Sequence, residues 1–486
     1  MMAVITLSPA GRRLTVEAGT RLQDVLFAEG VEFPCGGRGR CRGCRVRVLQ
    51  GRLETTAEER EKLGEAVEEG WRLACRHAVD GDLTLELAQW EMPVLGDETA
   101  FAFVPQTGLG IAVDLGTTTI AVQLLDLADG HVLAVKTALN AQARHGADVL
   151  SRVAYALQGG QDELQRLIRE QIAAMIGDML QEPLRRVVLV GNTVMHHLFC
   201  GIDIAPLATH PFLPRRPGRV NLPPGILGLG SETEVVFLPC IGGLVGADIL
   251  AGVIATGLHV REELSALIDL GTNGEVVVGR GGQLLCTSTA AGPAFEGARI
   301  SMGMRAASGA IDAVEVRDGV LSCRVIGGGT ARGLCGSGLV DAVVAGLELR
   351  SIQPGGKLAA ALPLADGVTL SPPDVRELQL AKGAIAAGLR ILAARFGAVP
   401  SDITRLYLAG AFGNSIARTG ARRIGLLRLE ENRIVPAGNT ALQGAKRALF
   451  ADLQDWEALA QRIGHVALNE EPSFEDVFTE EMRFPG

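Results

Sequence analysis

The chain has little of what marks several common classes of protein. Its nine cysteines are few and unevenly spaced for 486 residues, which excludes the disulfide framework of a small secreted domain. Aromatic residues make up only 4% of the chain and the formal net charge is -9. Nucleic-acid-binding surfaces combine basic and aromatic side chains, so we expect no nucleic-acid partner. The cysteine usage predicts a protein of the reducing cytoplasm.

A long apolar run free of charge is also absent. Residues 239–260 come closest, but they contain five glycines and Asp248. A buried strand, turn and helix explain that pattern better than a membrane span. Residues 1–7 are followed at once by Ser8 and then by two arginines, which does not match a secretory signal. The sequence therefore predicts no membrane association.

The composition instead indicates large folded cores. Hydrophobic residues make up 47% of the chain, charged residues 21%, and there are 62 glycines. The chain length and the high hydrophobic fraction predict two or three domains with extensive cores, and the glycines predict many tight loops.

Four cysteines form the most specific pattern. Three lie in the run Phe33-Pro-Cys35-Gly-Gly-Arg-Gly-Arg-Cys41-Arg-Gly-Cys44, and Cys75 stands alone further on. The C-x5-C-x2-C spacing is one residue longer than the plant-ferredoxin run and suits a 2Fe-2S cluster held by one wrapped loop. Structural zinc usually takes two short-spaced pairs of ligands, which this spacing does not match. Zinc or a disulfide stays open as the less favoured alternative. The other cysteines are simplest as small core residues: Cys200, Cys240, Cys286, Cys323 and Cys335.

Arginines crowd the same loop in an otherwise acidic chain. Two interpretations stay open: a solvated rim that offsets the negative charge of a cluster, or a docking face for an acidic redox partner, where complementary charge raises the association rate. The residues concerned are Arg38, Arg40, Arg42, Arg45 and Arg47.

The segments around this loop predict a small β-grasp domain. Strands are expected at 3–7, 12–16, 45–49 and 83–87, and a helix capped by Thr20 continues to residue 29. Residues 1–90 resemble the adrenodoxin-like branch of 2Fe-2S ferredoxins, which share the cysteine spacing. This resemblance implies that a 2Fe-2S cluster is held by Cys35, Cys41, Cys44 and Cys75.

Residues 91–109 show no sustained period and are predicted to be a linker. About seventeen extended residues reach roughly 55 Å. That length would let a ferredoxin domain swing between a reductant and a second partner at high effective concentration.

Two loops in the rest of the chain share one pattern. Asp114-Leu-Gly-Thr-Thr-Thr119 and Asp269-Leu-Gly-Thr-Asn-Gly274 each follow an apolar strand. Such a loop brings a carboxylate, hydroxyls and backbone N–H groups to the phosphates and Mg2+ of a nucleotide. Two copies about 155 residues apart predict a duplicated domain, with subdomains 110–264 and 265–486 facing each other across a cleft.

A third glycine cluster, Leu406-Tyr-Leu-Ala-Gly410-Ala-Phe-Gly413, ends another strand and lacks the P-loop pattern. With the two loops, it resembles the superfamily of acetate and sugar kinases, heat-shock chaperone ATPases and actin. The resemblance implies an α/β multidomain chain with an actin-like ATPase fold. Residues implied at the phosphates or Mg2+ are Asp114, Gly116, Thr117, Thr118, Thr119, Asp269, Gly271, Thr272, Asn273 and Gly274. Residues implied at the nucleoside are Gly410, Ala411, Phe412 and Gly413.

A glycine-rich stretch at 327–338 precedes an apolar helix. Backbone N–H groups at a helix start suit anions, so we include Gly336, Ser337 and Gly338 as candidate nucleotide contacts. Close packing is the alternative explanation of the glycines.

Catalytic acids are harder to assign. Asp148 and Asp248 each follow a Gly-Ala pair at an expected helix start, where negative charge is favourable by about 0.3–1 kcal/mol. The functional alternative is orientation of the attacking water or of Mg2+, and Glu275 and Glu296 are further candidates.

The combination resembles one family along nearly the full chain: the ATP-dependent reductive activators of corrinoid proteins. The matching motifs are Asn140-Ala-Gln142 with Gly146-Ala-Asp148-Val, Val190-Gly-Asn-Thr193-Val-Met-His-His197, Ala291-Gly-Pro-Ala-Phe-Glu296-Gly, Leu334-Cys-Gly-Ser-Gly338 and Phe474-Glu-Asp-Val-Phe478. The resemblance implies that ATP helps to return one electron to an inactive Co(II) corrinoid protein of a methyltransferase system, restoring Co(I). An upstream low-potential reductant would supply the electron, and a homodimer would agree with the family.

Three other functions stay open at this stage. The chain would also suit a redox-sensing kinase, a chaperone-like ATPase with a structural cluster, or an ATP-driven donor to another low-potential enzyme. The last resembles the activators of acyl-CoA dehydratases, which carry the cluster within the ATPase fold, whereas this chain has a dedicated N-terminal domain.

Overall fold

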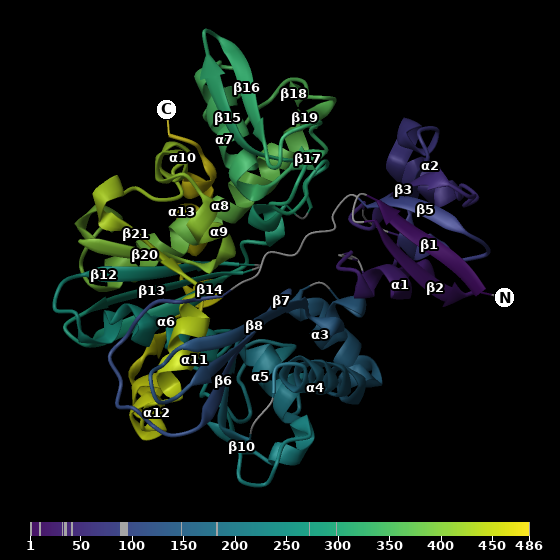
Figure 1. The fold of residues 1–486 in the computed structure, drawn as a ribbon. Coiled ribbons are helices and arrows are strands. Elements are labelled where there is room, and N and C mark those ends of the chain that lie inside the picture. Colours follow the sequence, from purple (N-terminus) through teal and green to yellow (C-terminus); the bar gives the residue numbers. More distant parts are fainter. Residues whose placement is uncertain are drawn as a thin grey trace.

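A computed structural model gives three bodies: a small domain at the N-terminus and two larger lobes, with the small domain beside the opening between them (Figure 1). The structure describes residues 2–8, 11–31, 33, 36–39, 42–87, 96–146, 148–180, 183–271, 273–297 and 299–485.

The N-terminal domain is a five-stranded mixed sheet in the order β2-β1-β5-β3-β4. Alternating buried and exposed residues in β1 supply one apolar face, and α1 covers it through Leu22, Leu26 and Phe27. The sheet and its helix confirm the β-grasp prediction. The predicted Thr20 cap is wrong: Arg21 is the N-cap, and its side chain makes no capping bond. The elements are β1 Met2–Ser8, β2 Arg12–Glu17, α1 Leu22–Ala28, β3 Arg45–Gln50, α2 Ala57–Leu63, β4 Trp71–Leu73 and β5 Leu83–Leu87.

Lobe I and lobe II are each built on a six-stranded sheet, in the orders β10-β11-β9-β6-β7-β8 and β21-β20-β12-β13-β14-β22. In lobe I, β6 pairs antiparallel with β7 and parallel with β9. In lobe II, β12 pairs in the same way with β13 and β20. This repeated topology confirms the predicted duplication. The strands of lobe I are β6 Leu109–Leu115, β7 Thr119–Asp126, β8 Val132–Leu139, β9 Leu184–Gly191, β10 Val220–Leu222 and β11 Glu234–Phe237. Those of lobe II are β12 Ser265–Leu270, β13 Gly274–Arg280, β14 Gln283–Thr289, β20 Arg405–Ala409, β21 Ile434–Gly438 and β22 Gly464–His465.

Helices cover the sheets, and two of them pack away from the strands that precede them in the chain. Although α11 and α12 follow β21 of lobe II in sequence, their apolar residues belong to a large core that contains the sheet of lobe I and extends to Leu267, Val277 and Cys286 of lobe II. The helices are α3 Val149–Tyr155, α4 Gln161–Gly177, α5 Thr193–Cys200, α6 Ala247–Thr256, α7 Gly336–Glu348, α8 Pro372–Arg395, α9 Gly410–Ser415, α10 Arg418–Arg423, α11 Thr440–Ala448, α12 Leu453–Arg462 and α13 Phe474–Met482. Lobe II also carries the strands β15 Ala310–Arg317, β16 Val320–Val325, β17 Gly333–Leu334, β18 Leu362–Ala365 and β19 Val368–Leu370.

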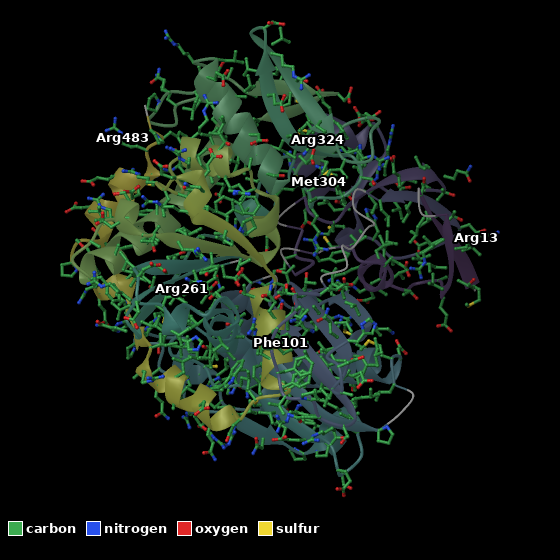
Figure 2. All side chains as sticks on the ribbon, turned by 60° about the vertical axis from the view of Figure 1, so that its left-hand side comes forward. Arg13, Phe101, Arg261, Met304, Arg324 and Arg483 are labelled. Atoms are coloured by element: carbon green, nitrogen blue, oxygen red, sulfur yellow. The ribbon has the colours of Figure 1, made fainter. Side chains whose placement is uncertain are left out.

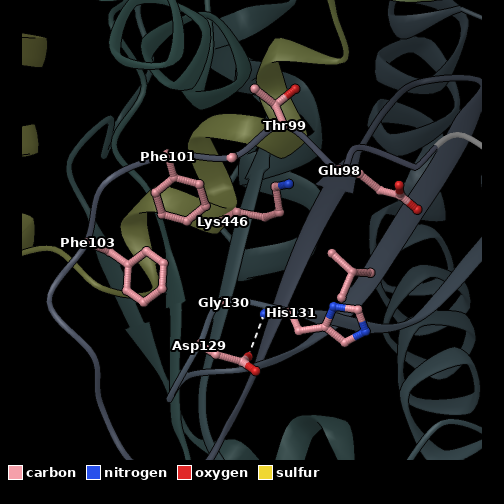
Figure 3. Close-up of a pocket in the computed structure, with 10 residues that line it drawn as sticks. Glu98, Thr99, Phe101, Phe103, Asp129, Gly130, His131 and Lys446 are labelled. Atoms are coloured by element: carbon pink, nitrogen blue, oxygen red, sulfur yellow. Dashed lines mark hydrogen bonds between the residues drawn. The ribbon is translucent and has the colours of Figure 1, made fainter.

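The second part of the predicted linker is packed rather than mobile. Residues 96–108, here called the strap, run over lobe I and α11 (Figure 3). Phe103 stacks near Phe450 with ring centroids 4.4 Å apart. Asp97 is buried, forms an ion pair with Lys446, and accepts a 2.7 Å hydrogen bond from Lys446 Nζ through its carbonyl oxygen. The strap has no regular period because its contacts are individual side chains, which a periodicity argument does not detect. Residues 91–95 of the predicted linker lie outside the described residues.

We expect Asp97→Ala to destabilise the protein by about 3 kcal/mol, because it leaves the ammonium group of Lys446 buried without its carboxylate. Lys446 is only 2% exposed. Chemical denaturation of the purified variant measures the change. The control is Asp178→Ala, which removes the partner of Lys136 at an exposed site and should cost less than about 1 kcal/mol. Equal costs for the two variants would contradict the buried pair.

No helix among the described residues combines the length and apolar character that crossing a membrane requires.

Candidate functional site

The two Asp-x-Gly-Thr loops face each other across a cavity of about 400 Å³ between the lobes, the interlobe cavity. Each loop is the turn of an antiparallel hairpin, β6–β7 in lobe I and β12–β13 in lobe II. In each hairpin the aspartate is the penultimate residue of the first strand, so apolar neighbours in the sheet fix its position. The lining residues are Gly96, Asp97, Asp114, Gly116, Thr117, Thr118, Thr119, Asn192, Asp248, Asp269, Leu270, Gly271, Asn273, Glu275, Glu296, Gly410, Phe412, Gly438, Asn439 and Ala441.

Close approach explains two of the loop glycines. A Cβ atom at Gly410, where φ is +85°, would lie 2.5 Å from the carbonyl oxygen of Leu270 and 2.7 Å from Asp269 Oδ1. At Gly116 it would lie 2.4 Å from the carbonyl oxygen of Thr119. Neither position can hold a side chain without moving a loop.

Four carboxyl groups meet in the interlobe cavity and raise one another's pKa. Burial, together with the charges of Asp269 and Asp114, raises the pKa of Asp248 to about 8. Burial and the charge of Asp114 raise the pKa of Asp269 to about 7. Burial raises the pKa of Asp114 to about 6, although a hydrogen bond from Asn439 opposes the change. Burial and the charges of Asp248 and Asp269 raise the pKa of Glu275 well above its usual value.

Such a group of acids ionises fully only beside a compensating positive charge. No three carboxylate, histidine or cysteine side chains among the described residues lie close enough together to ligate a metal by themselves. The site therefore suits a divalent cation that keeps most of its ligands as waters or phosphate oxygens and takes one or two from carboxylates.

Two asparagines complete the polar lining, and the sequence analysis did not assign them. Asn192 caps α5 and donates a 2.8 Å hydrogen bond from Nδ2 to Thr117 Oγ1. Asn439 caps α11 and donates a 2.9 Å hydrogen bond from Nδ2 to Asp114 Oδ2. Both asparagines stand in a Gly-Asn-Thr triplet, at 191–193 and 438–440. That repeat was the signal that could have identified Asn439.

Some predicted residues lie away from the interlobe cavity. Asp148 is the N-cap of α3, where its carboxylate accepts a 2.8 Å hydrogen bond from the backbone N–H of Ser151. This geometry favours the helix-cap explanation of Asp148. Asp248, in the first turn of α6, does line the cavity.

Close packing accounts for two glycines of the turn before α7, and nucleotide contact there stays a prediction. A Cβ atom at Gly336 would lie 1.8 Å from the carbonyl oxygen of Phe295, and one at Gly338 would lie 2.1 Å from that of Ile311. Gly336, Ser337 and Gly338 are buried at the start of α7 and are not among the residues lining the interlobe cavity. Gly274 and Gly413 are likewise not among them. Thr272 and the side chain of Ala411 lie outside the described residues.

The described half of the cysteine set is gathered at one end of the N-terminal sheet. Cys44 directly precedes β3, and Cys75 follows β4 by one residue. The backbone N–H of Ala74 donates a 3.0 Å hydrogen bond to the carbonyl oxygen of Cys44, which holds the two segments side by side. Both cysteines are buried, at 1% and 7% exposure. Soft thiolates brought together on a tight loop fit an iron-sulfur cluster. Cys35 and Cys41 lie outside the described residues.

Positive φ angles favour glycine in this loop, and close neighbours leave little room for a side chain. Gly37 and Gly39 have φ of +73° and +69°, and a Cβ atom at these positions would lie 2.0 Å from Gln23 Oε1 and 2.3 Å from Arg76 Nε. The loop therefore folds tightly against α1 and against the turn that carries Cys75.

The arginines of the cluster loop have separate roles. Arg45 donates to the carbonyl oxygen of Arg332 in lobe II, and Arg47 donates to that of Glu69. Arg38 and Arg42 are exposed, and Arg40 lies outside the described residues. Arg45 and Arg47 thus make contacts within the chain, and among the described arginines of this group Arg38 and Arg42 remain for a partner surface.

The acid cluster predicts a pH dependence. Because the folded state holds its carboxyl protons to higher pH than the unfolded chain does, the fold without a cation loses stability as pH rises from about 4 to about 8. Cation and nucleotide should bind the ionised acids and release protons. We therefore expect the thermal shift caused by Mg-ATP to be several degrees larger at pH 8 than at pH 6. Calorimetry in buffers of different ionisation enthalpy measures the proton release, and proton uptake on binding would contradict the cluster's role.

Comparisons with known proteins match the N-terminal domain and both lobes. Residues 5–80 match a 2Fe-2S iron-sulfur cluster binding domain, residues 109–261 match the RACo middle region, and residues 263–486 match the C-terminal domain of RACo, the ASKHA domain.

Two relatives resemble most of the chain. The chain is 32% identical to the corrinoid activation enzyme RamQ of Eubacterium limosum over 412 residues, covering 76% of this chain and 69% of that protein. It is 30% identical to the [Co(II) methylated amine-specific corrinoid protein] reductase of Methanosarcina barkeri, covering 77% of each. A solved structure of a reductive activator for a corrinoid, iron-sulfur protein superposes with a TM-score of 0.70 at 25% identity, covering 99% of this chain and 98% of that one. The chain therefore belongs to the family of corrinoid-protein reductive activators, which join a 2Fe-2S domain to an ATPase of the ASKHA class.

Proposed function

We propose that this chain uses ATP to transfer one low-potential electron to the cobalt of a corrinoid protein, returning inactive Co(II) to Co(I) for methyl transfer. The observation that carries the proposal is the joining of a 2Fe-2S domain to two lobes that enclose an acid-rich cavity. The names of the two relatives, one a corrinoid activation enzyme and the other a reductase of a Co(II) corrinoid protein, support the same substrate.

Residues of both lobes would bind the nucleotide. Backbone N–H groups and hydroxyls of residues 116–119 and backbone N–H groups of Gly271 and Asn273 suit its phosphates, and Gly410 and Phe412 suit its nucleoside. Mg2+, when bound, would neutralise the phosphates and the acids, chiefly Asp114, Asp248 and Asp269. Thr117 and Asp114 would be held in place by Asn192 and Asn439.

Asp248 is the acid best suited to accept a proton from the attacking water. Once a bound cation offsets the burial and the neighbouring charges that raise its pKa, the Asp248 carboxylate is ionised and can act as a general base. Its backbone position in the first turn of α6 fixes the carboxylate against the interlobe cavity.

In the N-terminal domain, Cys35, Cys41, Cys44 and Cys75 would hold the 2Fe-2S cluster, which supplies one electron at a time near about -400 mV. An upstream low-potential reductant must then reload the domain after each transfer. Moving an electron uphill costs about 2.3 kcal/mol for each 100 mV. Nucleotide can offset this cost only by binding one conformation of the protein or its complex more tightly than another.

The proposal is tested with anaerobically purified, reduced protein and an added Co(II) corrinoid protein. The visible spectrum should develop a Co(I) band with Mg-ATP and only a slow, small one without it. Equal rate and extent of Co(I) formation without ATP would refute the proposal. ATP turnover with an intact cluster and no cobalt change, across several corrinoid proteins, would point to another redox client.

A further inference from the structure

The 2Fe-2S domain is seated against both lobes, on the side away from its outer edge, where Arg13 lies (Figure 2). Towards lobe I the contact is mainly apolar. Leu139, at the end of β8, is buried within the core of the 2Fe-2S domain, and Ala143 packs against the same core. The guanidinium of Arg144 lies 5.0 Å from the ring centroid of Phe27. The cluster loop touches this surface too, because a Cβ atom at Gly36 would lie 3.5 Å from the carbonyl oxygen of His145.

Towards lobe II the contact is polar and centres on one residue. Arg332 Nη2 lies 2.9 Å from Glu86 Oε1 in β5. Arg332 also donates to the carbonyl oxygen of Leu87 at 3.5 Å and accepts from Arg45 at 3.4 Å through its own carbonyl oxygen. The side chains of Arg332 and Glu86 are 30% and 18% exposed.

Each half of this seat is tied to the interlobe cavity. Asn140, next to Leu139, is fully buried. Its backbone N–H donates to the carbonyl oxygen of Thr118 and its Nδ2 to that of Gly116, both at 2.9 Å. The seat residues of lobe I therefore move with the phosphate-side loop of lobe I.

In lobe II, the turn that carries Arg332 leads into α7, whose first residue packs against Phe295 and Phe412. Phe295 and Phe412 stack with ring centroids 4.6 Å apart, and Phe412 lines the cavity. The seat residues of lobe II therefore move with the opposite wall of the cavity.

We propose that Leu139, Ala143, Arg144 and Arg332 form a two-lobed seat for the 2Fe-2S domain, and that nucleotide-driven movement of the lobes breaks its Arg332–Glu86 half while its lobe I half holds. A domain that contacts both lobes cannot keep both sets of contacts when the angle between the lobes changes. The apolar contact with lobe I tolerates a small rotation, whereas an ion pair at 2.9 Å is lost within a few ångströms.

The consequence for electron transfer is control of access to the cluster loop. In the seated position Gly36 of the loop lies against lobe I and Arg45, just after the loop, contacts lobe II, so release from lobe II would open this side to a partner protein. This inference rests on the proposed nucleotide role of the interlobe cavity and gives the nucleotide a specific structural output.

Electron–electron distance measurements test the proposal on the intact, cluster-loaded protein. A nitroxide is attached through a genetically encoded ketone side chain at Val320 of lobe II or at Leu150 of lobe I, which are 68% and 59% exposed. The second spin is the reduced cluster. Mg-ATP should change the distance to Val320 and leave the distance to Leu150 unchanged. Without nucleotide, the distances measured from position 320 should show a ratio of seated to released molecules about fivefold lower in Arg332→Ala than in the native protein. Arg332→Lys should keep this ratio near the native value.

Arg324→Ala is the matched control, because Arg324 forms a bidentate pair with Asp312 within lobe II; it should leave both distances unchanged. Thermal shifts establish that each variant is folded and binds Mg-ATP. An unchanged Val320 distance on Mg-ATP binding, an altered Leu150 distance, or no effect of Arg332→Ala would each overturn the proposal. The readout contains no corrinoid protein, so the distances can behave as proposed even if the cobalt assay fails, and the reverse.

Discussion

Cys44→Ala is expected to abolish Co(I) formation, reducing it to the rate measured without the protein, while Mg-ATP still binds. Cys44 is almost completely buried and lies beside Cys75 at one end of the N-terminal sheet, as a cluster ligand must. An incomplete thiolate set cannot hold a 2Fe-2S cluster normally. The substitution does not change the interlobe cavity, because other residues line it. Visible and electron-paramagnetic spectra follow the cluster, and the thermal shift with Mg-ATP follows the nucleotide.

The control for this variant is Cys323→Ala, in β16 of lobe II. It removes a half-buried thiol remote from the N-terminal sheet and should leave both the cluster spectrum and Co(I) formation unchanged. A native cluster spectrum and full activity in Cys44→Ala would show that the ligand assignment is wrong.

Asp248→Asn is expected to lower ATP turnover and ATP-dependent cobalt reduction by about 100-fold and, at pH 8, to raise the melting temperature of the nucleotide-free protein. The two effects have one cause. Burial and the charges of Asp269 and Asp114 raise the pKa of Asp248, so the folded protein holds the ionised carboxylate at a cost that the neutral amide removes. The amide cannot accept the proton of the attacking water or balance a cation.

Asp162→Asn makes the same chemical change in the first turn of α4, where the side chain is exposed. It should leave turnover unchanged and should not raise the melting temperature. Activity assays and differential scanning calorimetry on both variants give the comparison. If Asp248→Asn kept native turnover, the water-activating role would be refuted; a lowered melting temperature at pH 8 would refute the electrostatic account.

The fold followed from local patterns that physical chemistry constrains strongly. Apolar strands ending in Asp-x-Gly-Thr specified the hairpins β6–β7 and β12–β13, and their repetition specified the two lobes. The cysteine run specified the N-terminal domain because ligand spacing and glycine conformation are both visible in sequence.

Long-range contacts were not visible in the same way. The Asp97–Lys446 pair joins residues far apart in the chain, and nothing near Asp97 marks it as buried. The packing of α11 and α12 into the core that joins the two lobes likewise depends on which apolar helix face meets which sheet. At Gly336, sequence alone leaves anion binding and packing open, whereas the nearby carbonyl oxygen of Phe295 supplies a packing reason for the glycine.

The most direct test of the central claim is a measurement of Co(I) at a fixed potential. The protein and a Co(II) corrinoid protein are held anaerobically at about -400 mV, near the expected potential of the cluster, and the Co(I) fraction is read from the visible spectrum before and after Mg-ATP. We predict that ATP raises this fraction well above its equilibrium value at that potential and that it declines when ATP is exhausted. A fraction that ATP makes appear faster but leaves at the same final value would contradict the claim that nucleotide drives the electron uphill.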